Sequence, residues 1–160
     1  RRSSDLWNKI FKLDLFNGVV PVRFPKGRVQ EDNFTIFMLF LNANSIVTVN
    51  EPLYYYVQRA GSIMATFTRR FMIDTIESHI YMSDYLMNHC SSVKNELQLY
   101  LLNSYVELSR RVCANKCKKE YNDLLIQYKH YVLDHTADTS HNPMWKCKQY
   151  IKRLLVKLYY

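Results

Sequence analysis

The stretch SIVTVNEPLYYYV, residues 45–57, decides whether the sequence predicts a sheet. Its first run, Ser45 to Val49, is short and rich in β-branched residues, and its last run, Leu53 to Val57, is rich in tyrosine. Both compositions are typical of strands. The residues Asn50-Glu51-Pro52 between them favour a turn. The stretch therefore predicts two strands joined by a turn, at the end of a sheet.

Two helices are expected before this stretch. Apolar residues near one face predict a short helix over residues 5–15, and glycine and proline residues then interrupt any regular element over residues 18–27. Beyond this loop, apolar residues at helical spacing over residues 34–41 predict a helix that is buried on most sides. Glu31 and Asp32 lie where the loop meets this helix, so Asp32 is expected at or near its N-terminus.

The remainder of the chain has a different texture. From about residue 68 to residue 160 there is one proline and no glycine, and apolar residues recur at spacings of three and four. This pattern predicts helices at roughly 68–90, 93–115, 117–135 and 143–158. No run of apolar residues approaches the length of a transmembrane helix. We therefore expect two domains, residues 1–66 and residues 67–160.

The basic charge belongs to the end of the chain. The formal net charge is +8, and lysine and arginine concentrate after about residue 109. Within residues 145–159, four aliphatic side chains share one helical face, while Lys148, Lys152 and Arg153 lie largely off it. This pattern is typical of a helix on an anionic membrane surface, and equally of a helix that docks on its neighbours. Nucleic acid is not an expected partner, because the basic residues are not interleaved with aromatic ones in a reader motif.

Cysteine and histidine do not predict a metal site. Cys90, Cys113, Cys117 and Cys147 all fall in helical segments without a dense disulfide framework, which indicates a reducing, cytosolic compartment. Cys113 and Cys117 lie one helical turn apart, but no CxxC or HxxxH motif supplies further ligands, so helix packing is favoured over zinc. The five histidines lie in the helical part, away from any carboxylate cluster, and surface or packing roles are expected for them.

Glu31 and Asp32 form the one candidate pair of catalytic carboxylates that the pattern yields. Acidic residues are also favoured in the first turn of a helix, where they bind free N–H groups and oppose the helix dipole. On periodicity alone, the capping interpretation is therefore favoured.

Five linked motifs change this balance. They are Trp7-Asn8-Lys9-Ile10-Phe11-Lys12, then Phe24-Pro25-Lys26-Gly27, then Glu31-Asp32, then Glu51-Pro52-Leu53-Tyr54-Tyr55-Tyr56, then Gln58-Arg59 with Gly61-Ser62-Ile63. In order and spacing they resemble the second half of family 2 glycosyltransferases, which are inverting enzymes of the GT-A-type fold. The resemblance covers about residues 4–64.

The resemblance implies an α/β fold. Residues 1–66 would form the acceptor-side half of a GT-A-like nucleotide-sugar transferase domain, and an α-helical C-terminal region would follow. It also implies a preceding donor-binding half, whose Asp-x-Asp motif would bind most of a divalent cation, Mg or Mn. That half is missing here, and a start at Arg1 rather than Met resembles a cut inside a longer polypeptide. The chain by itself is then expected to be inactive.

The resemblance also assigns roles to individual residues. Asp32 becomes the catalytic base, because a sugar hydroxyl is a poor nucleophile near neutral pH and needs a group that takes its proton. Glu31 would orient Asp32 or cap the helix. Trp7 and Asn8 would line the acceptor pocket, although a tryptophan in a short amphipathic helix is as often a core residue. The segment implied to close over the donor diphosphate carries Gln58, Arg59, Gly61 and Ser62.

The leading hypothesis is an inverting glycosyltransferase of cell-surface polysaccharide or glycolipid assembly. It would move a sugar from a nucleotide-diphosphate sugar to a hydroxyl of a saccharide or lipid-linked acceptor. This work would place the chain in the cytoplasm, with peripheral attachment to the anionic inner face of the plasma membrane. The alternatives are a non-catalytic remnant, or a basic helical module that binds nucleic acid or membrane.

Overall fold

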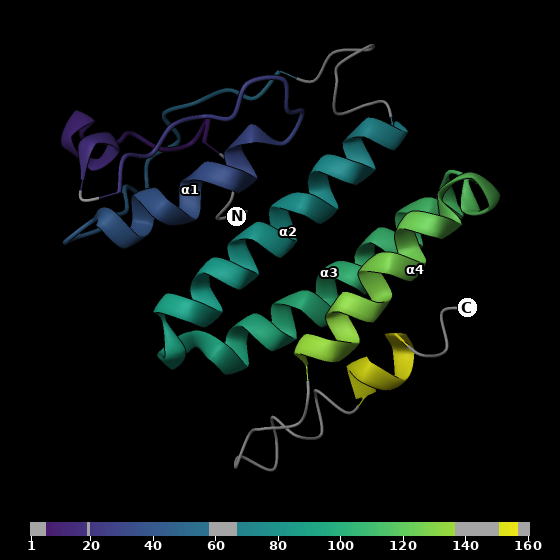
Figure 1. The fold of residues 1–160 in the computed structure, drawn as a ribbon. Helices are drawn as coiled ribbons and strands as arrows, with labels where there is room; N and C mark the ends of the chain where they lie inside the picture. Colours follow the sequence, from purple (N-terminus) through teal and green to yellow (C-terminus); the bar gives the residue numbers. More distant parts are fainter. Residues whose placement is uncertain (1–5, 19, 58–66, 137–150, 157–160) are drawn as a thin grey trace. The chain divides into compact units, whose positions relative to one another are not determined.

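The computed structural model describes residues 6–18, 20–57, 67–136 and 151–156 (Figure 1). Residues 1–78 form one compact unit, called here the N-terminal unit, and residues 79–160 form a second, the helical unit. In chain order the elements are η1 (Leu13–Asn17), α1 (Glu31–Asn42), α2 (Arg69–His89), η3 (Ser91–Val93), α3 (Lys94–Ala114) and α4 (Lys118–His135). The boundary predicted after residue 66 borders the undescribed residues 58–66 and stays a prediction.

The expected α/β, GT-A-like fold is wrong for this structure. Of the described residues, 68% are helical and none belongs to a strand. The two strands predicted at 45–49 and 53–57 do not form, and every residue from 45 to 57 is exposed. Strand propensity expresses how well a side chain fits a pleated, half-buried surface, and a strand also needs a hydrogen-bonded neighbour. No described segment supplies that neighbour, so the composition by itself does not produce a sheet.

The short helix predicted over residues 5–15 is also wrong for the residues described there. Residues 6–12 are not helical, and a single 3-10 turn, η1, follows them. Ile10 is 100% exposed and Leu13 is 75% exposed, so the expected apolar stripe has no surface against which to pack. Short helices depend on such packing, because their own hydrogen bonds barely offset the entropy of nucleation.

In the N-terminal unit, α1 forms where the sequence predicts a buried helix. Its buried residues are Thr35 to Leu39, and Leu39 is fully buried. The loop before it turns at Gly27, whose φ of 74° suits glycine because it lacks a Cβ. At the other end, the Asn42 side-chain amide donates to the backbone oxygen of Leu15 at 2.9 Å and ties α1 to η1. The same unit contains the first half of α2, which begins after Thr68; the Thr68 hydroxyl accepts a hydrogen bond from the Phe71 N–H at 3.1 Å.

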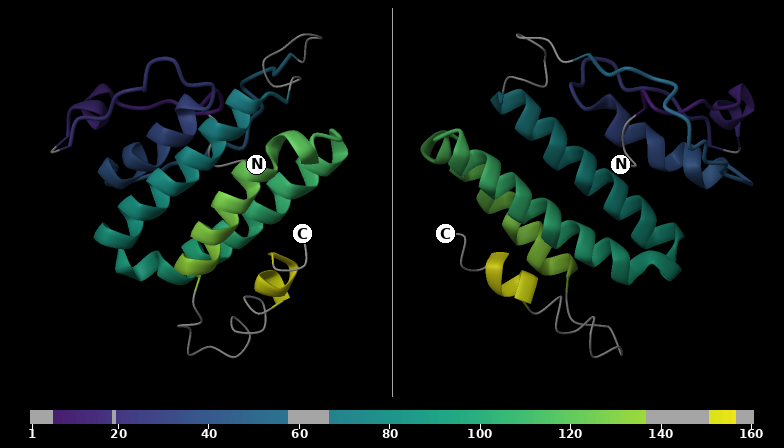
Figure 2. Two further views of the ribbon diagram at one scale, coloured as in Figure 1. Left: turned by 45° about the vertical axis from the view of Figure 1, so that its right-hand side comes forward. Right: turned by 180° about the vertical axis from the view of Figure 1, so that it is seen from behind.

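The helical unit confirms three of the helices predicted in the second half of the chain. The predicted ranges 68–90, 93–115 and 117–135 agree within one residue at each end with α2, α3 and α4. Figures 1 and 2 show α3 and α4 side by side and antiparallel. The turn between them places Lys116 at a φ of 57°. Along α4 the buried residues recur every three or four positions, as its sequence predicts: they are Tyr121, Leu125, Tyr128 and Val132.

The last predicted helix is described only in part. Residues 151–156 are helical, and the rest of the predicted range 143–158 lies outside the described residues. The Arg153 guanidinium donates to the Leu133 backbone oxygen at 3.0 Å and to the Thr136 hydroxyl at 2.9 Å, and Val156 is fully buried. This segment therefore docks on the end of α4. None of the helices in the described part of the chain is long and apolar enough to cross a membrane.

Candidate active site

The carboxylate pair predicted from the sequence lies in the first turn of α1. Asp32 is half-buried and Glu31 is exposed. An oxygen of the Asp32 carboxylate accepts a hydrogen bond from the Asn33 N–H at 2.9 Å. The N-cap residue, Gln30, makes no side-chain capping bond to the helix, and its side-chain oxygen instead accepts from the Asn33 amide at 2.7 Å. The free N–H groups and the positive end of the helix dipole therefore favour the ionised form of a carboxylate at this position.

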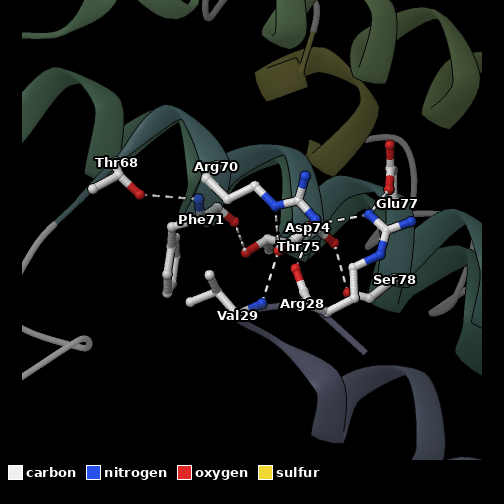
Figure 3. Close-up of polar contacts among 10 residues, drawn as sticks. Arg28, Val29, Thr68, Arg70, Phe71, Asp74, Thr75, Glu77 and Ser78 are labelled. Carbon is white, nitrogen blue, oxygen red and sulfur yellow. Dashed lines mark hydrogen bonds and ion pairs between the residues drawn. The ribbon is translucent and has the colours of Figure 1, made fainter. Parts of the chain in front are cut away.

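A second carboxylate, Asp74 on α2, is the centre of the polar contacts behind this turn (Figure 3). Its side chain is fully buried. One oxygen accepts from the Arg28 guanidinium at 2.8 Å, and the other accepts from the Val29 backbone N–H at 2.8 Å and from Arg70 Nε at 3.1 Å. Arg28 also pairs with the exposed Glu77. We call these five residues the Asp74 cluster.

The electrostatics keep Asp74 ionised near neutral pH. Burial on its own raises the pKa of a carboxyl, but the hydrogen bonds from Val29 and Arg28 and the charges of Arg70 and Arg28 outweigh it, so the pKa of Asp74 is lowered. The same hydrogen bonds, from Asp74 first and Glu77 second, raise the pKa of Arg28. The buried charge is therefore compensated on both of its oxygens.

The Asp74 cluster also holds the loop that leads into α1. The Arg70 guanidinium donates to the backbone oxygen of Gly27 at 2.9 Å. The Arg28 guanidinium lies over the Phe34 ring, 5.2 Å from its centroid. Three consecutive loop residues, Gly27 to Val29, are thus bonded to α2, and Arg28 contacts the first turn of α1 as well.

Sequence reasoning missed the Asp74 cluster. One signal was available: Asp74 interrupts an otherwise apolar run that includes Phe71, Met72 and Ile76, and a buried carboxylate in such a run needs partners. Arg70, four residues earlier, is the local partner that helix spacing indicates. Arg28 is 46 residues away in the sequence, and no local pattern points to it.

The predicted acceptor residues lie on an exposed aromatic surface. The Trp7 ring is 5.2 Å from the Tyr54 ring and 5.0 Å from the Tyr56 ring, between centroids. The three side chains are 42%, 54% and 48% exposed, so Trp7 is not a core residue. Asn8 is exposed beside them, and its side-chain oxygen accepts from the Lys9 ammonium at 2.6 Å. We call Trp7, Tyr54 and Tyr56 the aromatic triad. The predicted donor-contacting residues, Gln58, Arg59, Gly61 and Ser62, lie outside the described residues.

The helical unit holds a polar group of its own around His79. A ring nitrogen of His79 lies 2.9 Å from the Tyr128 hydroxyl, and its ring contacts those of Tyr128 and Tyr100. Burial lowers the pKa of His79 to about 4, so the ring is neutral near neutral pH. Close to this group, the Tyr131 hydroxyl donates to the Asp84 carboxylate at 2.5 Å. His79 thus has the packing role expected of it.

No metal site is found in the part of the chain that the structure describes. None of its His, Cys, Asp and Glu side chains form a group of three or more that could hold an ion. Cys113 is exposed and Cys117 is half-buried with its thiol directed at the Asn115 backbone oxygen, at 3.1 Å. Cys147 lies outside the described residues. The sequence contains no Asp-x-Asp motif, so the residues present do not fit the divalent cation that the resemblance implies.

Comparison with known proteins finds similarity to glycosyltransferases. No family model matches the chain, and no solved structure matches it. A first relative, Glycosyltransferase GlyG of Streptococcus pneumoniae serotype 4, is 43% identical over 58 residues, which are 36% of this chain and 18% of the relative. A second, Glycosyltransferase GlyA of the same organism, is 26% identical over 94 residues, which are 59% of this chain and 13% of the relative. The similarity thus covers less than a fifth of either relative and supports a glycosyltransferase at this coarse level only.

Proposed function

We propose that this chain carries the acceptor side of an inverting glycosyltransferase that uses a nucleotide-diphosphate sugar, with Asp32 as its general base. The observation that carries the proposal is the 43% identity to Glycosyltransferase GlyG over 58 residues. The position of Asp32 supports it, because a half-buried carboxylate at the start of a helix remains ionised and still accessible to a substrate. Glu31 is exposed beside it, in a place to cap the helix or to support Asp32.

The reaction is a direct displacement at the anomeric carbon. The acceptor oxygen forms a bond to that carbon while the bond to the diphosphate oxygen breaks, and in-line attack inverts the configuration. Asp32 takes the proton of the acceptor hydroxyl as its oxygen attacks. The electron pair of the broken bond leaves with the nucleoside diphosphate. That group departs more easily when a divalent cation, Mg or Mn, neutralises its charge.

The remaining substrate contacts divide between the two partners. Gln58, Arg59, Gly61 and Ser62 are proposed to contact the donor, because a guanidinium and free backbone N–H groups suit phosphate oxygens. Trp7 and Asn8 are proposed to contact the sugar ring of the acceptor, saccharide or lipid-linked. The aromatic triad supports this role, since it presents apolar ring faces to solvent beside the Asn8 amide.

Attachment to an anionic membrane surface is the proposal that fits the basic C-terminal segment, and it suits a cytoplasmic enzyme with a lipid-linked acceptor. Although Arg153 and Val156 are used in docking, Ile151 and Leu154 remain 50% and 44% exposed. Co-sedimentation with vesicles of phosphatidylcholine and phosphatidylserine tests it. Binding that weakens with added salt supports the proposal, whereas equal recovery in the supernatant with and without phosphatidylserine contradicts it.

Acceptor-dependent transfer in the native full-length polypeptide tests the proposed activity. The probes are UDP-glucose, UDP-galactose and UDP-N-acetylglucosamine as donors, p-nitrophenyl glycosides as acceptors, and MnCl2 or MgCl2. Release of UDP that requires both an acceptor and the cation, and that stops with EDTA, is the expected result. Absence of transfer with every pair would favour the alternative, a non-catalytic remnant.

A further inference from the structure

We propose that Asp74 is a positioning residue for the site at the start of α1: from α2 it holds the loop Gly27 to Val29, and so fixes where Asp32 is presented. This inference rests on the proposed function, because it assigns Asp74 a role that matters only if Asp32 does chemistry. Asp74 itself need not contact a substrate. It acts through the backbone that carries the catalytic side chain.

The contacts run in one direct line. Asp74 accepts from the Val29 backbone N–H at 2.8 Å, and Val29 stands three residues before Asp32. Its other oxygen accepts from Arg28 at 2.8 Å, and the Arg28 guanidinium covers the Phe34 ring, two residues after Asp32. Bonds on both sides of Asp32 in the sequence therefore converge on one carboxylate (Figure 3). A shift of that carboxylate would move the first turn of α1.

The chemistry of the Asp74 cluster favours positioning over bulk stability. An ionised group costs free energy to bury, and well-packed apolar residues often serve stability as well as a buried ion pair does. What an ionic cluster adds is direction, because its hydrogen bonds are satisfied in one arrangement only. Asp74 also lies on a helix of 21 residues, which is a stiff support for a loop.

The first test compares Asp74→Asn with the parent enzyme, using whichever UDP-sugar and p-nitrophenyl glycoside pair the native full-length polypeptide turns over. Asparagine keeps the shape of the side chain but presents an amide to the guanidinium groups. We expect kcat to fall on the order of tenfold to hundredfold, the scale of a displacement of about 1 Å at a reacting group. The KM for the donor should stay within about twofold, because donor contacts are not altered. Circular dichroism at the assay temperature establishes that each variant is folded.

Two further variants separate positioning from folding. Arg28→Gln removes the other side of the same pair, and the double variant Arg28→Gln/Asp74→Asn should be no slower than Asp74→Asn, because both changes break one connection. Arg28 is 29% exposed, so Arg28→Gln still provides the test if Asp74→Asn does not fold. Glu107→Gln, at an exposed position of α3, is the matched control and should keep full kcat. Independently of activity, amide hydrogen exchange over residues 31–37 should quicken in Asp74→Asn.

The outcomes distinguish this inference from the proposed function. If Asp32→Asn abolishes transfer but folded Asp74→Asn and Arg28→Gln keep the parent kcat, Asp32 remains the base and the positioning role is wrong. If Asp32→Asn retains turnover, the proposed function fails first and the positioning role fails with it. Equal losses of kcat in Asp74→Asn and in the Glu107→Gln control would also overturn the inference.

Discussion

Acidification from pH 7 to pH 4 is expected to destabilise the helical unit through one side chain, His79. Burial lowers the pKa of this histidine to about 4 in the folded chain, compared with its usual value of 6.5. Between these two values the unfolded chain binds a proton that the folded chain does not. Stability therefore falls as the pH drops from 6.5 towards 4, and this contribution levels off below pH 4.

The size of the effect follows from the same two values. Each unit of pKa difference corresponds to about 1.4 kcal/mol, so the loss is about 2 kcal/mol at pH 5 and about 3 kcal/mol at pH 4. A loss of this size is a large fraction of the stability of a small domain. The neighbours that His79 contacts are the tyrosines Tyr100 and Tyr128, and burial raises the pKa of both, so neither titrates in this range.

Hydrogen exchange is the suitable assay, because the two compact units need not unfold together. The amides of α3 that exchange slowest report opening of the helical unit, and their protection is compared at pH 7, 5 and 4 after correction for intrinsic exchange. The variant His79→Gln has no titrating ring and should lose most of the difference between pH 7 and pH 5. The reasoning is refuted if His79→Gln shows the same pH dependence as the parent chain.

Three further substitutions test other parts of the account. Gly27→Ala should destabilise the N-terminal unit by about 1 kcal/mol in urea denaturation, because the φ of 74° is strained for alanine although the added Cβ meets no atom within 4 Å; an unchanged midpoint would contradict it. Leu101→Ala, at a fully buried position of α3, should cost about 2–5 kcal/mol, while Leu13→Ala, at a 75% exposed position, should cost less than about 0.5 kcal/mol; similar losses would show that the core is misassigned. Trp7→Ala should raise the KM for a p-nitrophenyl glycoside acceptor on the order of tenfold, with a smaller change for the UDP-sugar. An increase confined to the donor would contradict the acceptor role.

The helices were predictable because their information is local. Apolar residues at spacings of three and four fix both the type and the buried face of a helix, and α1, α3 and α4 follow that pattern closely. The position of Asp32 followed with α1, since Gly27 and the prolines before it mark where the helix must begin.

The sheet was not predictable in the same way. Residues 45–49 and 53–57 have the composition of strands, but a strand forms only where another segment accepts its hydrogen bonds, and this partner cannot be read from the segment itself. The Asp74 cluster was missed for a related reason, because Arg28 and Asp74 meet only through the tertiary structure. The aromatic triad joins Trp7 to Tyr54 and Tyr56 over a similar distance along the sequence.

The measurement that tests the central claim most directly is the turnover of Asp32→Asn in the native full-length polypeptide. The control is Asp14→Asn, which makes the same change at an exposed carboxylate in η1. If Asp32 is the general base, Asp32→Asn binds the UDP-sugar as the parent enzyme does, but its acceptor-dependent release of UDP is lost, while Asp14→Asn keeps both. Retention of acceptor-dependent transfer by Asp32→Asn would contradict the account.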